Sequence, residues 1–207
     1  MARFAALVQG QDLAYLSAFN AAHPGQLTGI VGCTANLPIC RPHEFERMGK
    51  WHRVIFSSAR FTPQILPYMI RAGVAMARRS GDGGFLRTVL AESPLDRELL
   101  NDPKVMEALT TGNEVFFHHP HIAETLSAEI LATRFENTEE QVEALRGPFP
   151  VHMLHGQADL FTPPETLDER ERDFPWITFE RHANSGTLVF YRHWDRAIDL
   201  LEKFTKT

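Results

Sequence analysis

Four side chains that could take part in chemistry or ligand contact stand at the ends of short apolar segments. They are Gln11 and Asp12 after residues 4–8, Cys33 at the end of residues 27–33, and Asp159 after residues 150–155. Carboxylates and thiols serve proteins as nucleophiles, and carboxylates also orient histidines. These positions are therefore the first candidates for a functional site.

The apolar segments alternate with stretches of helical periodicity, which indicates the elements that position the candidates. Strands are expected at residues 4–8, 27–33, 150–155 and 176–179, and helices at 13–22, 163–173 and 191–204. Such short apolar strands are typical of a parallel sheet that is buried on both faces. We therefore predict an α/β fold with a mostly parallel sheet of about four strands. Ligands of such sheets bind beyond the carboxyl ends of the strands, where the candidates lie.

Residues 41–147 contain no strand-like pattern and are expected to form a helical lid inserted into the sheet domain. The predicted domains are thus 1–40 with 148–207 as the core, and 41–147 as the lid. Aromatic residues of the lid are candidates for lining a ligand pocket, although core packing explains them equally well. They are Phe56, Phe61, Tyr68 and Phe85.

Composition excludes several classes of protein. The chain has 207 residues, of which 43% are hydrophobic, and a formal net charge of -5, so neither disorder nor stand-alone nucleic-acid binding is indicated. No apolar run is long enough to span a membrane, and the first residues do not resemble a signal peptide. Cys33 and Cys40 are too few for a disulfide framework. We expect a cytoplasmic protein without a cofactor or a membrane partner.

The most conspicuous metal-like motif is His118-His119-Pro120-His121. No cysteine lies nearby, and only Glu124 follows His121 at a helical spacing, so a polar turn before a helix is the favoured interpretation. Cys33 has no histidine partner at a recognised spacing and is expected to be a core residue. No metal site is predicted.

Three segments resemble an α/β-hydrolase. Residues 151–163 resemble the strand and His-Gly loop that lead to the acid of the catalytic triad, which places that acid at Asp159. Residues 183–193 resemble the segment that carries the catalytic histidine. Residues 21–31 resemble the end of the helix behind the nucleophile and the next strand. The resemblance covers both ends of the chain, about half its length, and implies a C-terminal portion of that fold.

The resemblance also implies a degenerate triad, because the family needs a nucleophile, an acid and a histidine. Thr187 stands at the histidine position. At the nucleophile turn, one alignment places Asp12 in the slot and another places Gly10 there. Related dehalogenases and epoxide hydrolases use an aspartate, but they need the histidine to hydrolyse their ester intermediate. His155 and His182 are the nearest replacements, and Asp159 could serve only to accept hydrogen bonds in its loop.

The predicted nucleophile turn lies so early that no strands precede it to supply the oxyanion hole or to cover the first strand. An open apolar edge favours association with further strands, so we expect either a longer chain or a partner chain there.

These expectations favour a non-catalytic domain that binds a small apolar ligand or a partner, as in the sensing part of some transcription regulators. The predicted ligand contacts are Gln11, Asp12, Cys33, Phe56, Phe61, Tyr68 and Thr187. One alternative is a hydrolase of esters, halides or epoxides that uses Asp12 and Asp159 with a non-standard base. Another is a homodimer that completes its sheet by edge pairing.

Overall fold

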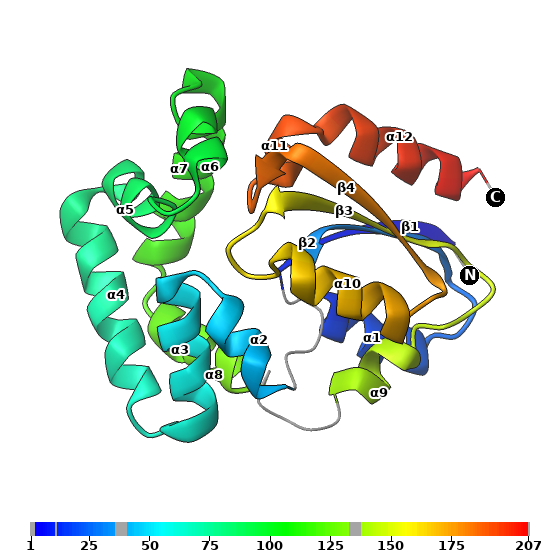
Figure 1. Cartoon of the computed structure of the whole chain (residues 1–207), viewed down its shortest axis with the longest axis horizontal. Coiled ribbons are helices and arrows are strands. Elements are labelled where there is room, and N and C mark those ends of the chain that lie inside the picture. Colours follow the sequence, from blue (N-terminus) through cyan, green and yellow to red (C-terminus); the bar gives the residue numbers. More distant parts are fainter. Residues whose placement is uncertain (1–2, 11, 36–40, 133–137, 207) are drawn as a thin grey trace. The chain divides into compact units, whose positions relative to one another are not determined.

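A computed structural model describes residues 3–10, 12–35, 41–132 and 138–206. The chain divides into two compact units, which are described separately. The sheet unit comprises Met1–Cys40 and Glu136–Thr207, and the helical unit comprises Arg41–Phe135. Figure 1 shows the strands and the two helical layers of the sheet unit. None of the helices in the described residues is long and apolar enough to cross a membrane.

The sheet contains four parallel strands in the order β1-β2-β3-β4. They are β1 (Phe4–Gly10), β2 (Leu27–Ala35), β3 (Val151–Ala158) and β4 (Ile177–Gly186). All nine residues of β2 are buried, because β2 lies inside the sheet and is covered on both faces. The predicted α/β class and the four-stranded parallel sheet are confirmed.

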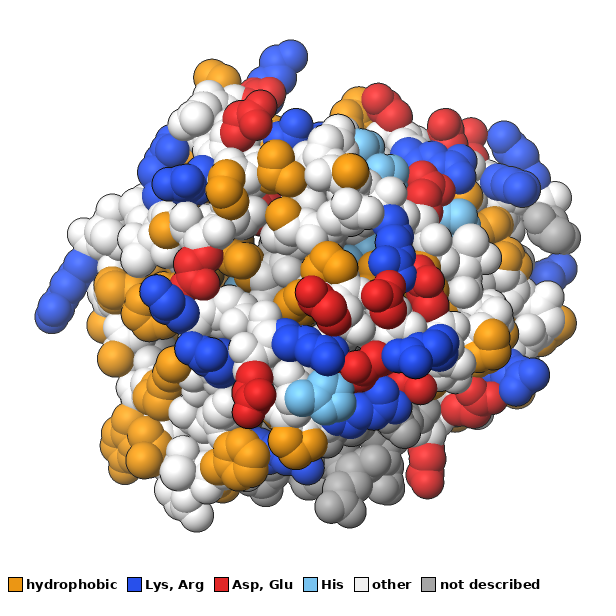
Figure 2. All heavy atoms as spheres, in the orientation of Figure 1, with side chains coloured by type: hydrophobic (Ala, Val, Ile, Leu, Met, Phe, Trp, Pro, Cys, Tyr) orange, Lys and Arg blue, Asp and Glu red, His pale blue; other side chains and the backbone are white. Residues whose placement is uncertain are grey.

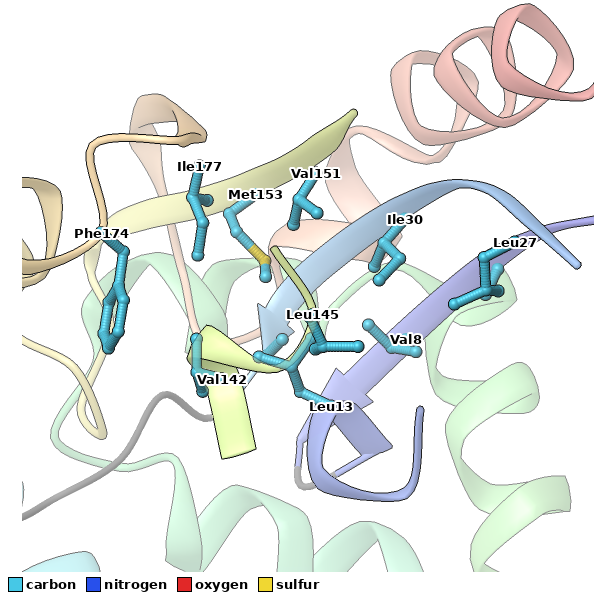
Figure 3. Packing of buried hydrophobic residues seen from close by; sticks show 12 residues of the cluster. Val8, Leu13, Leu27, Ile30, Val142, Leu145, Val151, Met153, Phe174 and Ile177 are labelled. Carbon is cyan, nitrogen blue, oxygen red and sulfur yellow. The ribbon is translucent and has the colours of Figure 1, made fainter. Parts of the chain in front are cut away.

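Helices cover both faces of this sheet (Figure 1). One face carries α1 (Asp12–Ala22), α9 (Thr138–Glu143) and α10 (Pro164–Asp173), and the other carries α11 (Val189–Arg192) and α12 (Trp194–Thr205). Successive strand residues enter opposite cores, as a strand requires. Ile30 and Met153 thus join the α1–α9 core, whereas Val31 and Leu154 join the α11–α12 core. Figure 3 shows the first of these cores.

The fourth strand is longer than its apolar pattern indicates. The sequence predicted a strand at 176–179, whereas β4 extends to Gly186. The part of β4 beyond residue 179 contains Glu180, Arg181 and His182, which are only partly buried. A strand at the edge of a sheet tolerates such polar residues. The apolar pattern of β4 therefore ends before its backbone hydrogen bonds to β3 do.

The helical unit is made of seven helices within the described residues, and none of its described residues forms a strand. They are α2 (Pro42–Arg47), α3 (Lys50–Phe61), α4 (Leu66–Ser80), α5 (Asp82–Val89), α6 (Pro94–Leu99), α7 (Pro103–His118) and α8 (Ile122–Ala132). Pro94 and Pro103 are the first residues of their helices. Proline lacks a backbone N–H, but at this position an N–H would have no partner within the helix. Gly81 separates α4 from α5 with a φ of 71°. The lid was expected to extend to residue 147, but α9 packs against α1 and belongs to the sheet unit.

Candidate functional site

The turn between β1 and α1 is sharp, and Gly10 forms it. Gly10 has a φ of 53°, a left-handed conformation that favours glycine. Asp12 begins α1 as an exposed residue, and its Oδ2 accepts a hydrogen bond from the backbone N–H of Gln9 at 3.3 Å. Gln11 lies outside the described residues. Among the described residues of the turn, Gly10 rather than Asp12 has the left-handed backbone expected at a nucleophile turn.

Asp159 is buried at the end of β3 and is held by several donors. Its Oδ1 accepts hydrogen bonds from the backbone N–H of Phe161 at 2.8 Å and from Thr187 Oγ1 at 3.0 Å. The ring nitrogen His155 Nε2 lies 2.9 Å from Oδ2. Burial alone would raise the pKa of Asp159, but the His155 ring and these two hydrogen bonds outweigh it and lower the pKa below its usual value. Asp159 is thus a buried carboxylate in its ionised form.

Thr187, which follows β4, is hydrogen-bonded to the end of β2 and to the loop after β3. Its hydroxyl donates to Asp159 and accepts the backbone N–H of Leu160 at 3.3 Å. Its carbonyl oxygen accepts a hydrogen bond from Thr34 Oγ1 at 2.9 Å. Thr187, which stands at the predicted histidine position, is therefore hydrogen-bonded directly to Oδ1 of Asp159, the predicted acid.

Thr34 was not predicted as part of this site. It lies near the end of β2, is buried and has a φ of 51°, the one positive φ at a non-glycine residue in the described chain. Such strain persists where surrounding contacts hold it, and the bond to Thr187 is one of those contacts. No sequence pattern signals a positive φ at threonine, so only its place in the loop after residues 27–33 could have suggested it.

His155 and His182 are the predicted replacements for the missing base. His155 is buried, and its Nε2 lies between two acceptors, Asp159 Oδ2 at 2.9 Å and the better aligned carbonyl of Thr162 at 3.1 Å. His182 lies farther back along β4, where its ring stacks on that of His193 and its Nε2 is 3.3 Å from Glu180 Oε1. Only His155 is brought to Asp159, and it sits in the interior.

Cys33 is buried on the α11–α12 side of β2, where it packs with Val31, Leu154 and Val189. Burial raises the pKa of its thiol to about 12, because the thiolate would lose its hydration. The thiol is therefore protonated at neutral pH and is a poor nucleophile.

This environment predicts that Cys33 resists alkylation. In a Cys40→Ser variant, where Cys33 is the remaining thiol, iodoacetamide at pH 8 should label the native protein at least about 100-fold more slowly than the urea-unfolded protein. Mass spectrometry over time measures both rates. Equal rates would contradict a buried, protonated Cys33.

The candidate aromatic residues belong to the helical unit. Phe56 is buried within it, whereas Phe61 and Tyr68 are 66% and 70% exposed. Phe85 packs edge-on against Phe117 with ring centroids 5.1 Å apart. In Figure 2 hydrophobic side chains gather over the α3–α4 turn, the part of the unit that holds Phe61 and Tyr68. Their place in a pocket shared with the sheet stays a prediction.

Two cavities of the structure are lined by none of the predicted contact residues. One, of about 410 Å³, is lined by Arg87, Pro94, Arg97, Glu98 and Asn101. The other is lined by Glu140, Glu143, Asp173 and Phe174. Both are open depressions with charged walls, which do not suit an apolar ligand.

His118 is the last residue of α7, and His119 and His121 lie in the connection from α7 to α8. The rings of His119 and His121 lie 5.9 Å apart, and Arg78 donates to the carbonyls of Phe117 and His119. Glu124 is paired with Arg71. Across the described part of the chain, no group of three or more histidine, cysteine or acidic residues is arranged to hold a metal ion.

No protein-family model and no curated protein matches the chain. Solved structures do match. An α/β hydrolase enzyme from a Medee basin deep-sea metagenome library superposes with a TM-score of 0.60 at 14% identity, over 100% of this chain and 66% of that one. A 2-hydroxy-6-oxo-6-phenylhexa-2,4-dienoate hydrolase from Rhodococcus gives 0.54 at 15% identity, over 97% and 63%. An esterase from Rhodococcus gives 0.52 at 18% identity, over 98% and 65%.

These likenesses establish the fold. The parallel sheet with its flanking helices is a partial α/β-hydrolase fold, and the chain spans about two thirds of the length of those enzymes. One fold hosts many functions, so activity depends on the residues of the site.

Proposed function

Because the chain has a partial α/β-hydrolase fold, we propose that it is a non-catalytic domain that binds a small, mostly apolar ligand or a partner. The observation that carries the proposal is the 3.0 Å hydrogen bond from Thr187 Oγ1 to Asp159. In a catalytic triad the acid holds a histidine that takes the nucleophile's proton. A threonine hydroxyl cannot take up a proton near neutral pH, so the bond orients no base.

The turn after β1 supports the same conclusion. Gly10, which has the left-handed backbone of the turn, has no side chain that could attack a substrate. If Asp12 attacked instead, the resulting ester would persist, because its hydrolysis needs water activated by a histidine. The histidine beside Asp159, His155, is buried and directs its Nε2 toward protein oxygens.

A hydrolase of esters, halides or epoxides is the alternative. It is favoured by the carboxylate of Asp12 beside the turn and by the retained contact between His155 and Asp159. It requires that one histidine move to reach a substrate. Turnover that depends on Asp159 would distinguish this alternative from the binding role.

A third candidate is a homodimer joined through β1. Among the described strands, β1 has β2 as its sheet neighbour, and Phe4 is 37% exposed. A second β1 could complete the sheet. Light scattering would then give twice the mass of one chain, and replacing Ala5 by Asp should return the mass to that of a monomer.

The proposed setting is the sensing part of a transcription regulator, in which a separate segment binds DNA. In that setting a missing triad is expected, since the ligand is recognised and not converted. The small apolar ligand would contact Phe61 and Tyr68, which are exposed in the helical unit.

Thermal unfolding with small apolar probes tests the binding role. At concentrations about 100 times its dissociation constant, a bound probe stabilises the folded state by about 2.7 kcal/mol. We expect hexanoate or 4-nitrophenol to raise the unfolding temperature of the wild type. The Phe61→Ala, Tyr68→Ala double variant should unfold at the wild-type temperature without probe, because both residues are exposed, and should lose the probe-induced rise.

Val115→Ala is the matched control, since Val115 is another highly exposed apolar residue of the helical unit. Its probe-induced rise should equal that of the wild type. The binding role at these two aromatic residues would be refuted if the double variant kept the full rise.

A further inference from the structure

A network of polar side chains joins the edge of the sheet to the last two helices. His152 of β3 and Glu180 and His182 of β4 lie on the sheet face that α11 and α12 cover, as alternate strand residues do. His193, between α11 and α12, and Arg196 of α12 approach them from the helices. Apolar contacts dominate the remainder of this face, so the network is a separate feature of the interface.

Glu180 is the centre of the network. Its carboxylate accepts hydrogen bonds from Arg196 at 2.7 Å and from His152 Nε2 at 2.9 Å, and His182 Nε2 lies 3.3 Å away. A carboxylate with this many donors is held in its charged form, and Arg196 is the main reason that its pKa is lowered. The carboxylate of Glu180 thus lies close to the guanidinium of Arg196 and to two histidine rings.

The rings of His182 and His193 are stacked. Their centroids lie 3.9 Å apart at an interplanar angle of 30°. His193 Nε2 is also within hydrogen-bonding distance of Ser185 Oγ at 3.0 Å and Asn184 Oδ1 at 3.1 Å. These contacts join the start of α12 to the end of β4, so His193 stabilises the packing of the helices against this strand.

The surroundings favour neutral rings. Burial is the main cause that lowers the pKa of both His182 and His193, and Arg196, His152 and Arg192 add positive charge nearby. Glu180 acts in the opposite direction on both rings, and the negative charge of Asp199 in α12 acts on Arg196, whose pKa it helps to raise. At neutral pH the rings of His182 and His193 are therefore uncharged and can stack without repulsion.

We propose that this histidine stack is an acid-sensitive latch, which releases α11 and α12 from β4 when His182 and His193 both become protonated. Two imidazolium rings at this separation repel each other, and Glu180 is already engaged by Arg196. The ion pair of Arg196 with Glu180 and the apolar packing of residues such as Leu200 and Phe204 would then hold the helices without the histidine stack. The segment 187–193, which begins with Thr187, would loosen with them.

The sign of the pH effect follows from the lowered pKa values. A histidine that is neutral in the folded state but titrates near pH 6.5 when unfolded stabilises the fold only above that pH. This contribution is lost as the pH falls through 6.5 and below. Carboxylates respond at lower pH, so the latch should open before acid unfolding begins.

Hydrogen exchange of individual amides at pH 7.5 and pH 5.5, corrected for the intrinsic pH dependence, tests the proposal. In the wild type the protection factors of α11 and α12 should fall about tenfold or more at pH 5.5, an opening local to these helices. Amides of α1, on the opposite face, should keep their protection. His193→Gln retains an amide that can bond Ser185 and Asn184, and it should abolish the fall.

His182→Gln serves as a second variant, which removes the other ring of the stack and should also abolish the fall. His23→Gln, at the exposed end of α1, is the matched control and should behave as the wild type. The proposal is overturned if both stack variants lose protection as the wild type does, if the wild type shows no loss, or if α1 loses protection to the same degree.

Discussion

Replacing Asp159 by Ala is expected to destabilise the sheet unit by about 3–5 kcal/mol, the cost of leaving several buried donors without their acceptor. The substitution takes the acceptor from Thr187 Oγ1 and from the Phe161 N–H, and it takes the negative charge from beside His155. Urea denaturation followed by circular dichroism measures the loss.

Two other substitutions calibrate this result. Asp159→Asn retains an oxygen at the Oδ1 position and should cost only about 1–2 kcal/mol. Asp12→Asn, at the exposed candidate carboxylate, should stay within about 0.5 kcal/mol of the wild type. If Asp159→Ala were as stable as Asp12→Asn, the structural role of the buried carboxylate would be wrong.

The lowered pKa of Asp159 adds a pH dependence with a definite sign. A carboxylate that titrates near pH 3.9 when unfolded and lower when folded stabilises the fold above that pH, and the stabilisation disappears as the pH falls through the folded pKa. The wild type should therefore lose more stability than Asp159→Asn between pH 5 and pH 3.

Gly156→Ala is the second substitution with a large expected effect, about 3 kcal/mol or more. A Cβ at Gly156 would meet the carbonyl oxygens of Ser185 and Gly186, so β3 and β4 could no longer approach each other there. The same strands carry Asp159 and Thr187 at their ends, and the bond between them should weaken as well.

The control for this prediction is Gly73→Ala. Gly73 lies within α4, where a Cβ would meet no other atom within 4 Å, so the substitution should be neutral or stabilise by up to about 1 kcal/mol. Thermal unfolding compares the two variants. Equal unfolding temperatures would show that the close approach of β3 and β4 does not require glycine.

The sheet could be predicted because its inner strands are apolar on both faces. Val31 and Leu154, like Ile30 and Met153, have no alternative to burial, and the segments that contain them pair as expected. The polar part of β4 beyond residue 179 could not be predicted, since hydrogen bonding at an edge leaves no periodic pattern. Residues 138–143 were expected in the lid, but as α9 they pack against α1, a contact that only the folded chain shows.

The candidate site was only partly predictable. The spacing after the third apolar segment led to Asp159, and the resemblance led to Thr187, but no sequence feature indicated that the two side chains share a hydrogen bond. The choice between Gly10 and Asp12 depended on a backbone angle. The stack of His182 on His193 depends on the packing of α12, which spacing alone does not specify.

Hydrolysis of 4-nitrophenyl acetate at pH 7.5 by the wild type and by Asp159→Asn tests the central claim most directly. The claim is that Thr187, bonded to Asp159, leaves the hydrolase fold without a base. We predict that neither protein releases 4-nitrophenol faster than the buffer does. Turnover by the wild type that is lost in a correctly folded Asp159→Asn variant would contradict the claim and establish a hydrolase.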